Sequence, residues 1–235
     1  MNQESSLFDK LLILSLETAG TSCSVCLSEG THVLFEMEEQ EAYRHNELLA
    51  DFTDRILKQA NLKVKELDAI VINHGPGSYT GLRVGFAFGK ALSYASGIPL
   101  YPVSGLEGMA TEAIRLSAAD WYVPMLDARR MEVYSAVYDG NLNCVEPPLP
   151  LILNEEFFAQ KRFADQKVLL IGEAAEKAIP LGPPSNFEFL SIDLKASNLI
   201  APALKRMRLP SEDSAYIEPM YLKEVRITTS KKTLK

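Results

Sequence analysis

The sequence has little of what marks a disulfide-rich, membrane or secreted protein. Its 235 residues include only three cysteines, too few for a disulfide framework. No apolar run approaches the ~18 residues that span a bilayer. The start of the chain has neither the basic residues nor the long apolar stretch of a signal peptide. We therefore expect a soluble, cytoplasmic protein without a membrane segment.

Basic residues are also in deficit, with 24 Lys and Arg against 31 Asp and Glu and a net charge of −7. Because phosphate contacts need clustered cations, this balance disfavours a dedicated nucleic-acid-binding protein. The deficit is uneven, however. From Lys223 to Lys235 five basic residues accompany one glutamate, a local charge of +4. This tail is either a solvated, frayed terminus or an arm that touches an anionic partner.

The residues that are present have the composition of a globular protein, with 47% hydrophobic and 23% charged residues. The length suits one large domain or two small ones. Apolar periodicity predicts strands over residues 11–16, 23–27, 33–37 and 69–73 and helices over 44–62 and 82–96. A second unit is predicted from a hairpin at 122–138, a strand at 168–171 and helices over 173–178 and 194–207. We therefore predict an N-terminal α/β domain over 1–104 and a C-terminal α/β domain over 105–235.

Cys23 and Cys26 have the C-x-x-C spacing of redox and zinc sites, but they lie in a predicted strand. Three strand steps of ~3.3 Å separate their Cα atoms by roughly 10 Å and turn the side chains to opposite faces. A disulfide tolerates about 7 Å. The pair is therefore predicted to be structural.

A glycine-rich turn over residues 75–81 follows a predicted strand and precedes a helix. In that context backbone N–H groups can hold an anion. The spacing matches neither the dinucleotide fingerprint nor the P-loop. Two interpretations stay open: a tight turn that needs small residues, or a phosphate site. The candidate phosphate-binding residues are Thr18, Gly75, Gly77 and Ser78.

The helix after this turn has small residues at every fourth position, namely Gly81, Gly85, Gly89, Ser93 and Gly97. An interior glycine costs ~1 kcal/mol relative to alanine, so the fold must recover this energy elsewhere. A helix face without side chains lets another backbone approach closely. That backbone belongs either to a sheet of the same chain or to a helix of another molecule.

Motifs of nucleophilic and metal catalysis are missing. The chain has three histidines, no G-x-S-x-G elbow and no H-E-x-x-H zinc pair. Asp127, Arg129 and Glu132 could form a polar site, although an aspartate before a tight turn is also ordinary turn chemistry.

Several segments together resemble the TsaB family, also called YeaZ. They are residues 14–18 (LSLET), 45–49 (HNELL), 75–85 (GPGSYTGLRVG), 127–134 (DARRMEVY) and 219–222 (PMYL). The matches come in order from residue 11 to about residue 222. This resemblance implies an α/β fold of the actin, Hsp70 and sugar-kinase class (an actin-like ATPase fold), with two ribonuclease-H-like domains.

The resemblance also implies a role in making N6-threonylcarbamoyladenosine (t6A) at position 37 of tRNAs that read codons beginning with A. In that system the paralogue TsaD transfers the threonylcarbamoyl group, TsaB is its non-catalytic dimerisation partner, and TsaE is a small ATPase. The expected partners are TsaD and TsaE, with tRNA bound only through the complex and a homodimer when the chain is alone. Lys231, Lys232 and Lys235 of the basic tail are candidates for contact with tRNA.

One segment separates this chain from the paralogue. TsaD has a His-Met-Glu-Gly-His block whose histidines hold the catalytic metal, and in that frame this chain has Gly105-Leu106-Glu107-Gly108-Met109. Glycine has no ligand atom, and a thioether is a poor ligand for a hard or borderline cation. We therefore expect no bound metal, no catalytic residue and no cofactor, with a nucleotide at the subunit interface left open.

The first functional hypothesis is a subunit that binds and activates TsaD through the glycine-striped helix and the helix over 44–62. The residues expected to bind the partner are His45, Leu48, Leu49, Phe52, Tyr79, Gly81, Gly85, Phe88 and Gly89. The alternative is an independent actin-fold ATP-dependent kinase that uses the turns at 17–22 and 75–81 for phosphates. A third interpretation, a glycoprotease, lacks a visible nucleophile or metal site.

Overall fold

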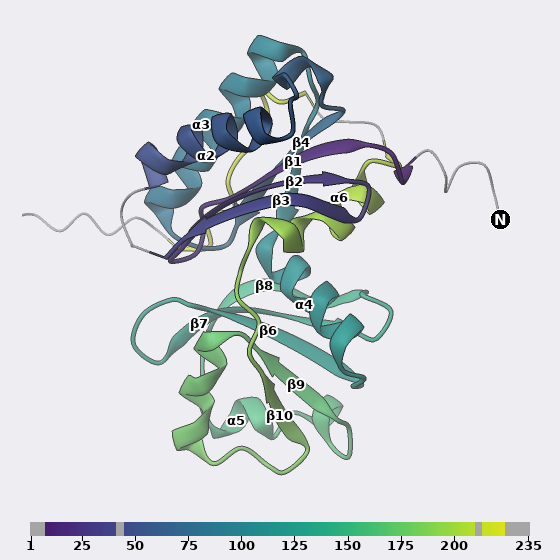
Figure 1. Cartoon of the computed structure of the whole chain (residues 1–235). Coiled ribbons are helices and arrows are strands. Elements are labelled where there is room, and N and C mark those ends of the chain that lie inside the picture. The colour runs from purple at the N-terminus through teal and green to yellow at the C-terminus, as the bar shows by residue number, and fades with distance from the viewer. Residues whose placement is uncertain (1–7, 41–44, 210–212, 224–235) are drawn as a thin grey trace, which may run out of the picture.

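The computed structural model describes residues 8–40, 45–209 and 213–223. The chain forms two lobes, each built on a five-stranded sheet (Figure 1). The first sheet contains β1 (Leu12–Glu17), β2 (Cys23–Glu29), β3 (His32–Glu39), β4 (Ala69–Gly75) and β5 (Leu100–Ser104). The second sheet contains β6 (Trp121–Asp127), β7 (Glu132–Asp139), β8 (Cys144–Ile152), β9 (Val168–Ile171) and β10 (Phe187–Leu190).

The two sheets have the same topology. Their strand orders are β3-β2-β1-β4-β5 and β8-β7-β6-β9-β10. In each sheet the first three strands pair antiparallel, and the remaining two run parallel to the first strand. This repeated ribonuclease-H-like arrangement confirms the fold expected from the sequence, an α/β fold of the actin class.

The first sheet is covered on both faces, because its apolar side chains alternate between them. On one face Leu14 and Ile72 pack under α2 (His45–Gln59) and α3 (Tyr79–Ser96). On the other face Ile13 and Val71 pack under η4 (Ala196–Leu199) and α6 (Ile200–Arg206). Part of the predicted domain 105–235 therefore packs on the first sheet, while the boundary at 104/105 itself stays a prediction.

The cysteine pair follows the same alternation. Cys23 lies in the core under α2 and α3, whereas Cys26 packs with Ala196 and Ile200 on the opposite face. Both thiols are free and buried. Burial raises the pKa of Cys23 to about 12, with the nearby Glu17 adding to the shift. The prediction that this pair is structural is confirmed.

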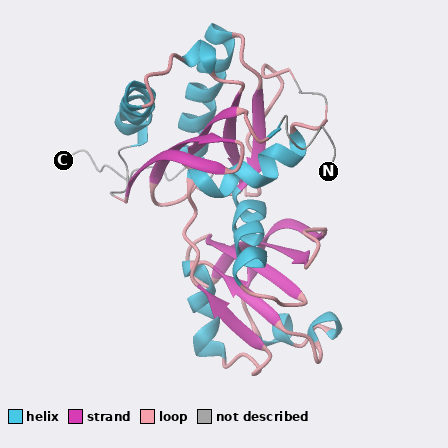
Figure 2. Cartoon of the chain, turned by 45° about the vertical axis from the view of Figure 1, so that its right-hand side comes forward, coloured by secondary structure: helices cyan, strands magenta, loops and turns pink. Residues whose placement is uncertain are grey.

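The second sheet is also covered on both faces. The helix α4 (Gly105–Leu116) packs on one face and also contacts η4, α6 and the end of the first sheet, so it lies between the lobes (Figures 1 and 2). The other face carries α5 (Glu155–Phe158), η2 (Lys161–Phe163) and η3 (Glu173–Leu181). A short helix η1 (Val64–Glu66) precedes β4. In the described residues, no helix has the length and apolarity to cross a membrane.

The chain ends its described part with a segment that contacts both lobes, which we name the C-terminal strap (residues 213–223). Ile217 is 3% exposed and belongs to the core of the first lobe. The N–H of Met220 donates to the carbonyl of His74 at 2.6 Å. In the second lobe Lys223 donates to the carbonyl of Ala128 at 2.9 Å.

Candidate functional site

The helix α3 follows the glycine-rich turn and has two faces of different character. Its first turn is capped by Ser78, whose Oγ accepts from the N–H of Gly81 at 3.2 Å. It ends at Gly97, which has a left-handed backbone with φ 77°. The small residues Gly81, Gly85, Gly89 and Ser93 are buried, whereas residues 83 and 87 are exposed. The helix therefore buries the face with the small residues and exposes the opposite face to solvent.

The glycine face of α3 packs against the helix's own lobe. A Cβ on Gly81 would overlap the carbonyl oxygen of Thr18, and one on Gly85 would overlap the hydroxyl of the same threonine. A Cβ on Gly89 would lie 2.7 Å from Ile72 Cγ2. Thr18 Oγ1 also donates to the carbonyl of Gly81 at 2.8 Å. The expectation that Gly81, Gly85 and Gly89 contact a partner is corrected here, because the sheet and the turn after β1 fill this face.

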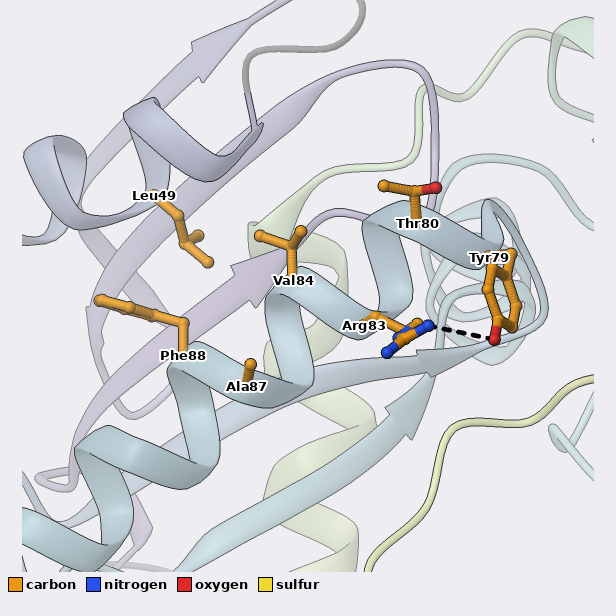
Figure 3. A pocket seen from close by; sticks show the side chains of 7 residues that line it. All are labelled: Leu49, Tyr79, Thr80, Arg83, Val84, Ala87 and Phe88. Carbon is orange, nitrogen blue, oxygen red and sulfur yellow. Dashed lines mark hydrogen bonds between the residues drawn. The ribbon is translucent and has the colours of Figure 1, made fainter.

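The opposite face of α3 forms one wall of an open groove of about 580 Å³ beside α2 (Figure 3). Its lining residues are Leu49, Tyr79, Thr80, Arg83, Val84, Ala87 and Phe88. Figure 3 shows Leu49 of α2 pointing toward Phe88 of α3, with Val84 between the two helices. The groove floor is apolar, and its end near the start of α3 is polar.

Tyr79 and Arg83 build that polar end. The ring of Tyr79 is 39% exposed. Arg83 Nη1 donates to the Tyr79 hydroxyl at 3.3 Å, and its guanidinium carbon lies 5.4 Å from the ring centroid. The Tyr79 ring also contacts Tyr221 of the C-terminal strap, with centroids 4.9 Å apart. The strap therefore extends the surface that α2 and α3 form.

The groove contains only some of the residues expected to bind a partner. Tyr79 and Phe88 line it, as does the edge of Leu49. Leu48 and Phe52 are 9% and 6% exposed and hold α2 on the sheet, so they are corrected to core residues. Leu49, 1% exposed, belongs to the same core and contributes only its edge to the groove. The side chain of His45 lies outside the described residues.

Sequence reasoning missed four groove residues, Thr80, Arg83, Val84 and Ala87. A signal for them was present, because they follow Tyr79 at the spacing of one helix face. The repeat of glycines instead predicted a contact on the adjacent face, which is buried in the lobe.

In the glycine-rich turn at 75–81, the candidate phosphate site, the polar groups form hydrogen bonds within the chain. The N–H of Ser78 donates to the carbonyl of Ala19 at 2.8 Å, and the N–H of Gly75 donates to Asn73 Oδ1 at 2.8 Å. A Cβ on Gly77 would overlap the Ala19 carbonyl. These hydrogen bonds, together with the one from the Thr18 hydroxyl to α3, join the turn after β1 to the glycine-rich turn after β4. The close packing of the turns explains the glycines without a phosphate group.

Glu17, at the end of β1, is the polar centre of these turns. Its side chain is fully buried, and one carboxylate oxygen accepts from the N–H of Ala19 at 2.6 Å and of Gly20 at 3.2 Å. The other oxygen accepts from Asn73 Nδ2 at 2.6 Å. Burial raises the pKa of Glu17 to about 7, although these hydrogen bonds oppose the shift.

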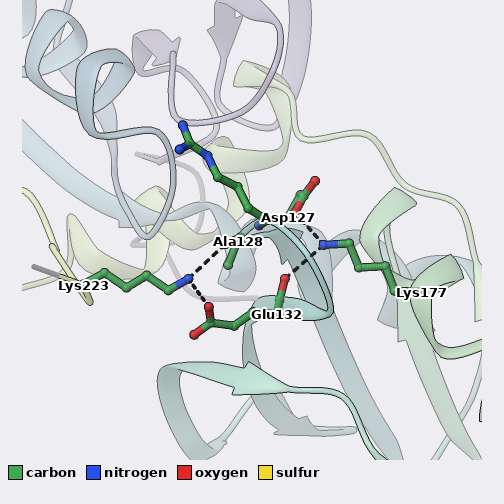
Figure 4. Close-up of polar contacts among 6 residues, drawn as sticks. Asp127, Ala128, Glu132, Lys177 and Lys223 are labelled. Carbon is green, nitrogen blue, oxygen red and sulfur yellow. Dashed lines mark hydrogen bonds and ion pairs between the residues drawn. The ribbon is translucent and has the colours of Figure 1, made fainter. Parts of the chain in front are cut away.

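A second polar cluster surrounds the turn between β6 and β7 (Figure 4). Lys177 Nζ contacts the carboxylate of Asp127 at 2.5 Å and the carbonyl of Glu132 at 3.0 Å. Lys223 of the strap pairs with the Glu132 carboxylate. Partial burial opposes it, but the hydrogen bond from Lys177 lowers the pKa of Asp127. The predicted grouping of Asp127 and Glu132 is therefore present, bridged by two lysines that the sequence did not place there.

The segment compared with the metal-binding paralogue forms the start of α4. Met109 is 1% exposed and packs in the second lobe. Gly105 donates its N–H to Asn73 Oδ1 at 3.0 Å. Within residues 8–40, 45–209 and 213–223, no group of three or more His, Cys, Asp or Glu side chains could hold a metal ion.

Known proteins resemble this chain in sequence and in fold. A family model described as "TsaD: tRNA N6-adenosine threonylcarbamoyltransferase" matches residues 38–212. The tRNA threonylcarbamoyladenosine biosynthesis protein TsaB of Haemophilus influenzae is 35% identical over 127 residues, 53% of this chain and 52% of that protein. The protein of the same name from Escherichia coli is 33% identical over 133 residues, 56% of each chain.

The chain belongs to the TsaB (YeaZ) family. It spans about half the length of the curated relatives it matches. The solved structure of YeaZ from Pseudomonas aeruginosa has a TM-score of 0.78 and 23% identity, covering 90% of this chain and all of that one. This TsaB-family chain therefore shares its two-lobed fold with a solved member.

Proposed function

We propose that this TsaB-family chain is a non-catalytic subunit that binds and activates a TsaD-type threonylcarbamoyltransferase. The reaction is N6-threonylcarbamoylation of adenosine 37 in tRNAs that read codons beginning with A. Two relatives are named for the biosynthesis of this nucleoside, which supports the pathway. The open groove between α2 and α3 supports the role as a binding subunit.

The groove has the composition of a protein–protein contact. Aromatic residues and arginine are enriched in such interfaces, and here Tyr79 and Arg83 stack on each other at one end. Val84, Ala87 and Phe88 supply an apolar centre. Each Å² of apolar surface that a partner covers contributes about 25 cal/mol. A helix pair of the partner could pack on α2 and α3 as helices pack in a bundle.

The same surface accounts for the partners expected from the family. When the transferase is absent, two copies of the chain can bury the groove against each other in a symmetric dimer. TsaE and tRNA would then join only after the transferase has bound. A transferase subunit competes with the second copy for one surface, so homodimer and complex exclude each other in this proposal.

The alternative of an independent ATP-dependent kinase has less support. Its phosphate site would need free backbone donors in the turns at 17–22 and 75–81. There the N–H groups of Ala19, Gly75 and Ser78 donate to groups of the same chain. Appreciable ATP turnover by the purified chain alone would favour the kinase over the subunit.

The test is binding to the TsaD protein of the same cell, with Ala87→Glu as the variant. Ala87 is exposed in the groove, so a carboxylate there is harmless to the monomer but is desolvated on binding. We expect affinity to fall at least about tenfold, with tRNA modification by the mixture falling in parallel.

The matched control is Ala201→Glu, the same change on the exposed side of α6 at the other face of the sheet. It should bind the transferase as well as the unmodified chain does. Failure of the unmodified chain to bind TsaD, or equal binding by both variants, would contradict the proposal.

A further inference from the structure

We propose that the turn between β6 and β7, with Arg129 and Arg130 at its tip, binds the phosphate backbone of RNA. This inference rests on the proposed function, in which the RNA is the tRNA that the complex modifies. It assigns that RNA a contact on this subunit and places it on the second lobe, where the C-terminal strap links the turn to the polar end of the groove between α2 and α3.

The backbone of the turn is held in an unfavourable conformation. Arg129 has φ 72° and Arg130 has φ 55°, so two consecutive residues other than glycine are left-handed. This conformation is energetically unfavourable for any residue with a Cβ. Glycine would fit both positions without this cost. Strained backbone is concentrated at functional sites. Glycines at both positions would relieve the strain, but they would also remove the two guanidinium groups. The guanidinium groups are therefore the feature that the strained turn retains.

The turn is fixed by its own hydrogen bonds. The N–H of Ala128 donates to the carbonyl of Glu132 at 3.1 Å, and the N–H of Glu132 donates to the carbonyl of Arg129 at 3.2 Å. The Asp127 carboxylate accepts from the N–H of Arg129. The arginine side chains are thus displayed from a defined backbone.

The charges around the turn leave both guanidinium groups exposed, although the charge of Arg129 also acts on Asp127. Lys177 pairs with Asp127, and Lys223 pairs with Glu132 (Figure 4). In the part of the chain that the structure describes, neither Arg129 nor Arg130 forms a salt bridge, and both are exposed. The two lysines neutralise the two carboxylates, so the tip has an excess of two positive charges.

The basic tail begins beside this turn. Lys223, the last described residue, is held on it by Glu132 and by the carbonyl of Ala128. Residues 224–235 contain four more cations and one glutamate. With Lys177 and Lys223, the turn has four cations and two carboxylates, in a chain with a net charge of −7. The described part of the strap thus ends on the turn, with a fourth cation, Lys223, next to it.

An extended polyanion fits this surface better than a small anion does. A small anion needs several donors that enclose it, whereas exposed Arg and Lys side chains contact successive phosphates of a nucleic acid backbone. An acidic protein is the other macromolecule that could bind here, and the experiment separates it from RNA.

The experiment uses the assembled complex with TsaD and a transcribed tRNA that reads a codon beginning with A. The variant Arg129→Gly/Arg130→Gly removes both guanidinium groups and relieves the backbone strain, so the fold should survive. At about 150 mM salt we expect roughly tenfold to thirtyfold weaker tRNA binding, and a dependence of log affinity on log salt that is shallower by about 1.5.

The control Lys63→Ala/Lys65→Ala removes two exposed cations beside η1 in the first lobe, and should leave affinity and salt dependence unchanged. Equal tRNA binding by the glycine variant and the control would overturn the proposal. So would weaker binding of the glycine variant to TsaD with unchanged RNA binding, which would assign the turn to an acidic protein.

Failure of the proposed function is distinguishable from failure of this inference. If the unmodified chain does not bind TsaD, the same tRNA is titrated against the full chain alone at low salt. Binding that the glycine variant loses and the control keeps would still support the turn as an RNA site. Equal binding of tRNA by the unmodified chain, the glycine variant and the control, or no binding by any of them, would overturn the assignment of the turn as an RNA site.

Discussion

At the scale of single residues, Glu17 decides how the turns of the first lobe fit together. Its carboxylate joins the turn after β1 to the side chain of Asn73, whose Oδ1 accepts from the N–H groups of Gly75 and Gly105. The side chains of Glu17 and Asn73 therefore hold together the connections that follow the parallel strands β1, β4 and β5. A buried carboxylate is costly unless it is hydrogen-bonded, which explains the three donors around it.

The stability of the chain should depend on the protonation of Glu17. Its pKa is about 7 in the folded state, against an ordinary value of 4.5. Between these values the folded state keeps a proton that the unfolded state has lost. The free energy of unfolding should therefore fall as pH rises through this interval, by up to about 3 kcal/mol from this group.

The variant Glu17→Gln isolates this contribution. It cannot titrate, so its free energy of unfolding should change less between pH 4.5 and pH 7 than that of the unmodified chain. Urea unfolding of both proteins across this range measures the difference. The variant is expected to be less stable at low pH, because an amide cannot accept all three hydrogen bonds. Identical pH slopes would show that Glu17 stays ionised.

At the scale of elements, α3 is built to lie very close to the turn after β1. The variant Gly81→Ala should therefore destabilise the fold, because the new Cβ would overlap the carbonyl oxygen of Thr18. Overpacking costs about 1–3 kcal/mol, which exceeds the ~1 kcal/mol that alanine gains in helix propensity. Thermal melts of the isolated chain measure the change.

A matched control exists for this prediction. At Gly140 the nearest atom to an added Cβ is the Ala119 carbonyl oxygen at 3.7 Å, an ordinary contact. Gly140→Ala should therefore leave the melting temperature nearly unchanged. Equal melting temperatures for both alanine variants would mean that α3 can move away from Thr18 at little cost.

The sequence predicted the regular elements better than their packing. Strands such as β1 and β4 are apolar runs with clear ends, so their periodicity was enough. The helix α4 was missed because two glycines, Gly105 and Gly108, stand in its first turn. Both glycines are needed for close contacts, with Asn73 and with the backbone of Asn198. Those contacts are tertiary and leave no local signal.

The candidate site shows the same limit. A repeat of glycines every four residues predicts a close approach, but it does not say which backbone approaches. Thr18, some 63 residues before Gly81 in the sequence, makes that contact. The exposed groove beside it was only partly predicted, because Val84 and Ala87 are unremarkable in sequence and become a surface once α2 lies next to them.

At the scale of the whole molecule, the C-terminal strap joins lobes that otherwise meet through α4, η4 and α6. It buries Ile217 in the first lobe, bonds to His74 through Met220, and reaches the second lobe through Lys223. Met220 also lies against Gly75, where the carbonyl oxygen of Met220 is 2.9 Å from the position of an added Cβ. The segment 219–222, which resembles the family motif, thus packs against the start of the glycine-rich turn.

Removal of the strap should destabilise the first lobe and loosen its connection to the second. A chain that ends at residue 212 loses the burial of Ile217, and deletion of a buried aliphatic side chain costs about 2–5 kcal/mol. For a chain of this size each kcal/mol lowers the melting temperature by roughly 2–4 °C, so we expect a decrease of about 10 °C. A chain that ends at residue 223 keeps the strap and should melt like the full chain. Calorimetry of the three proteins should show a separate, earlier transition only for the shorter one. The same melting curve for all three would mean that the strap rests on the lobes without stabilising them.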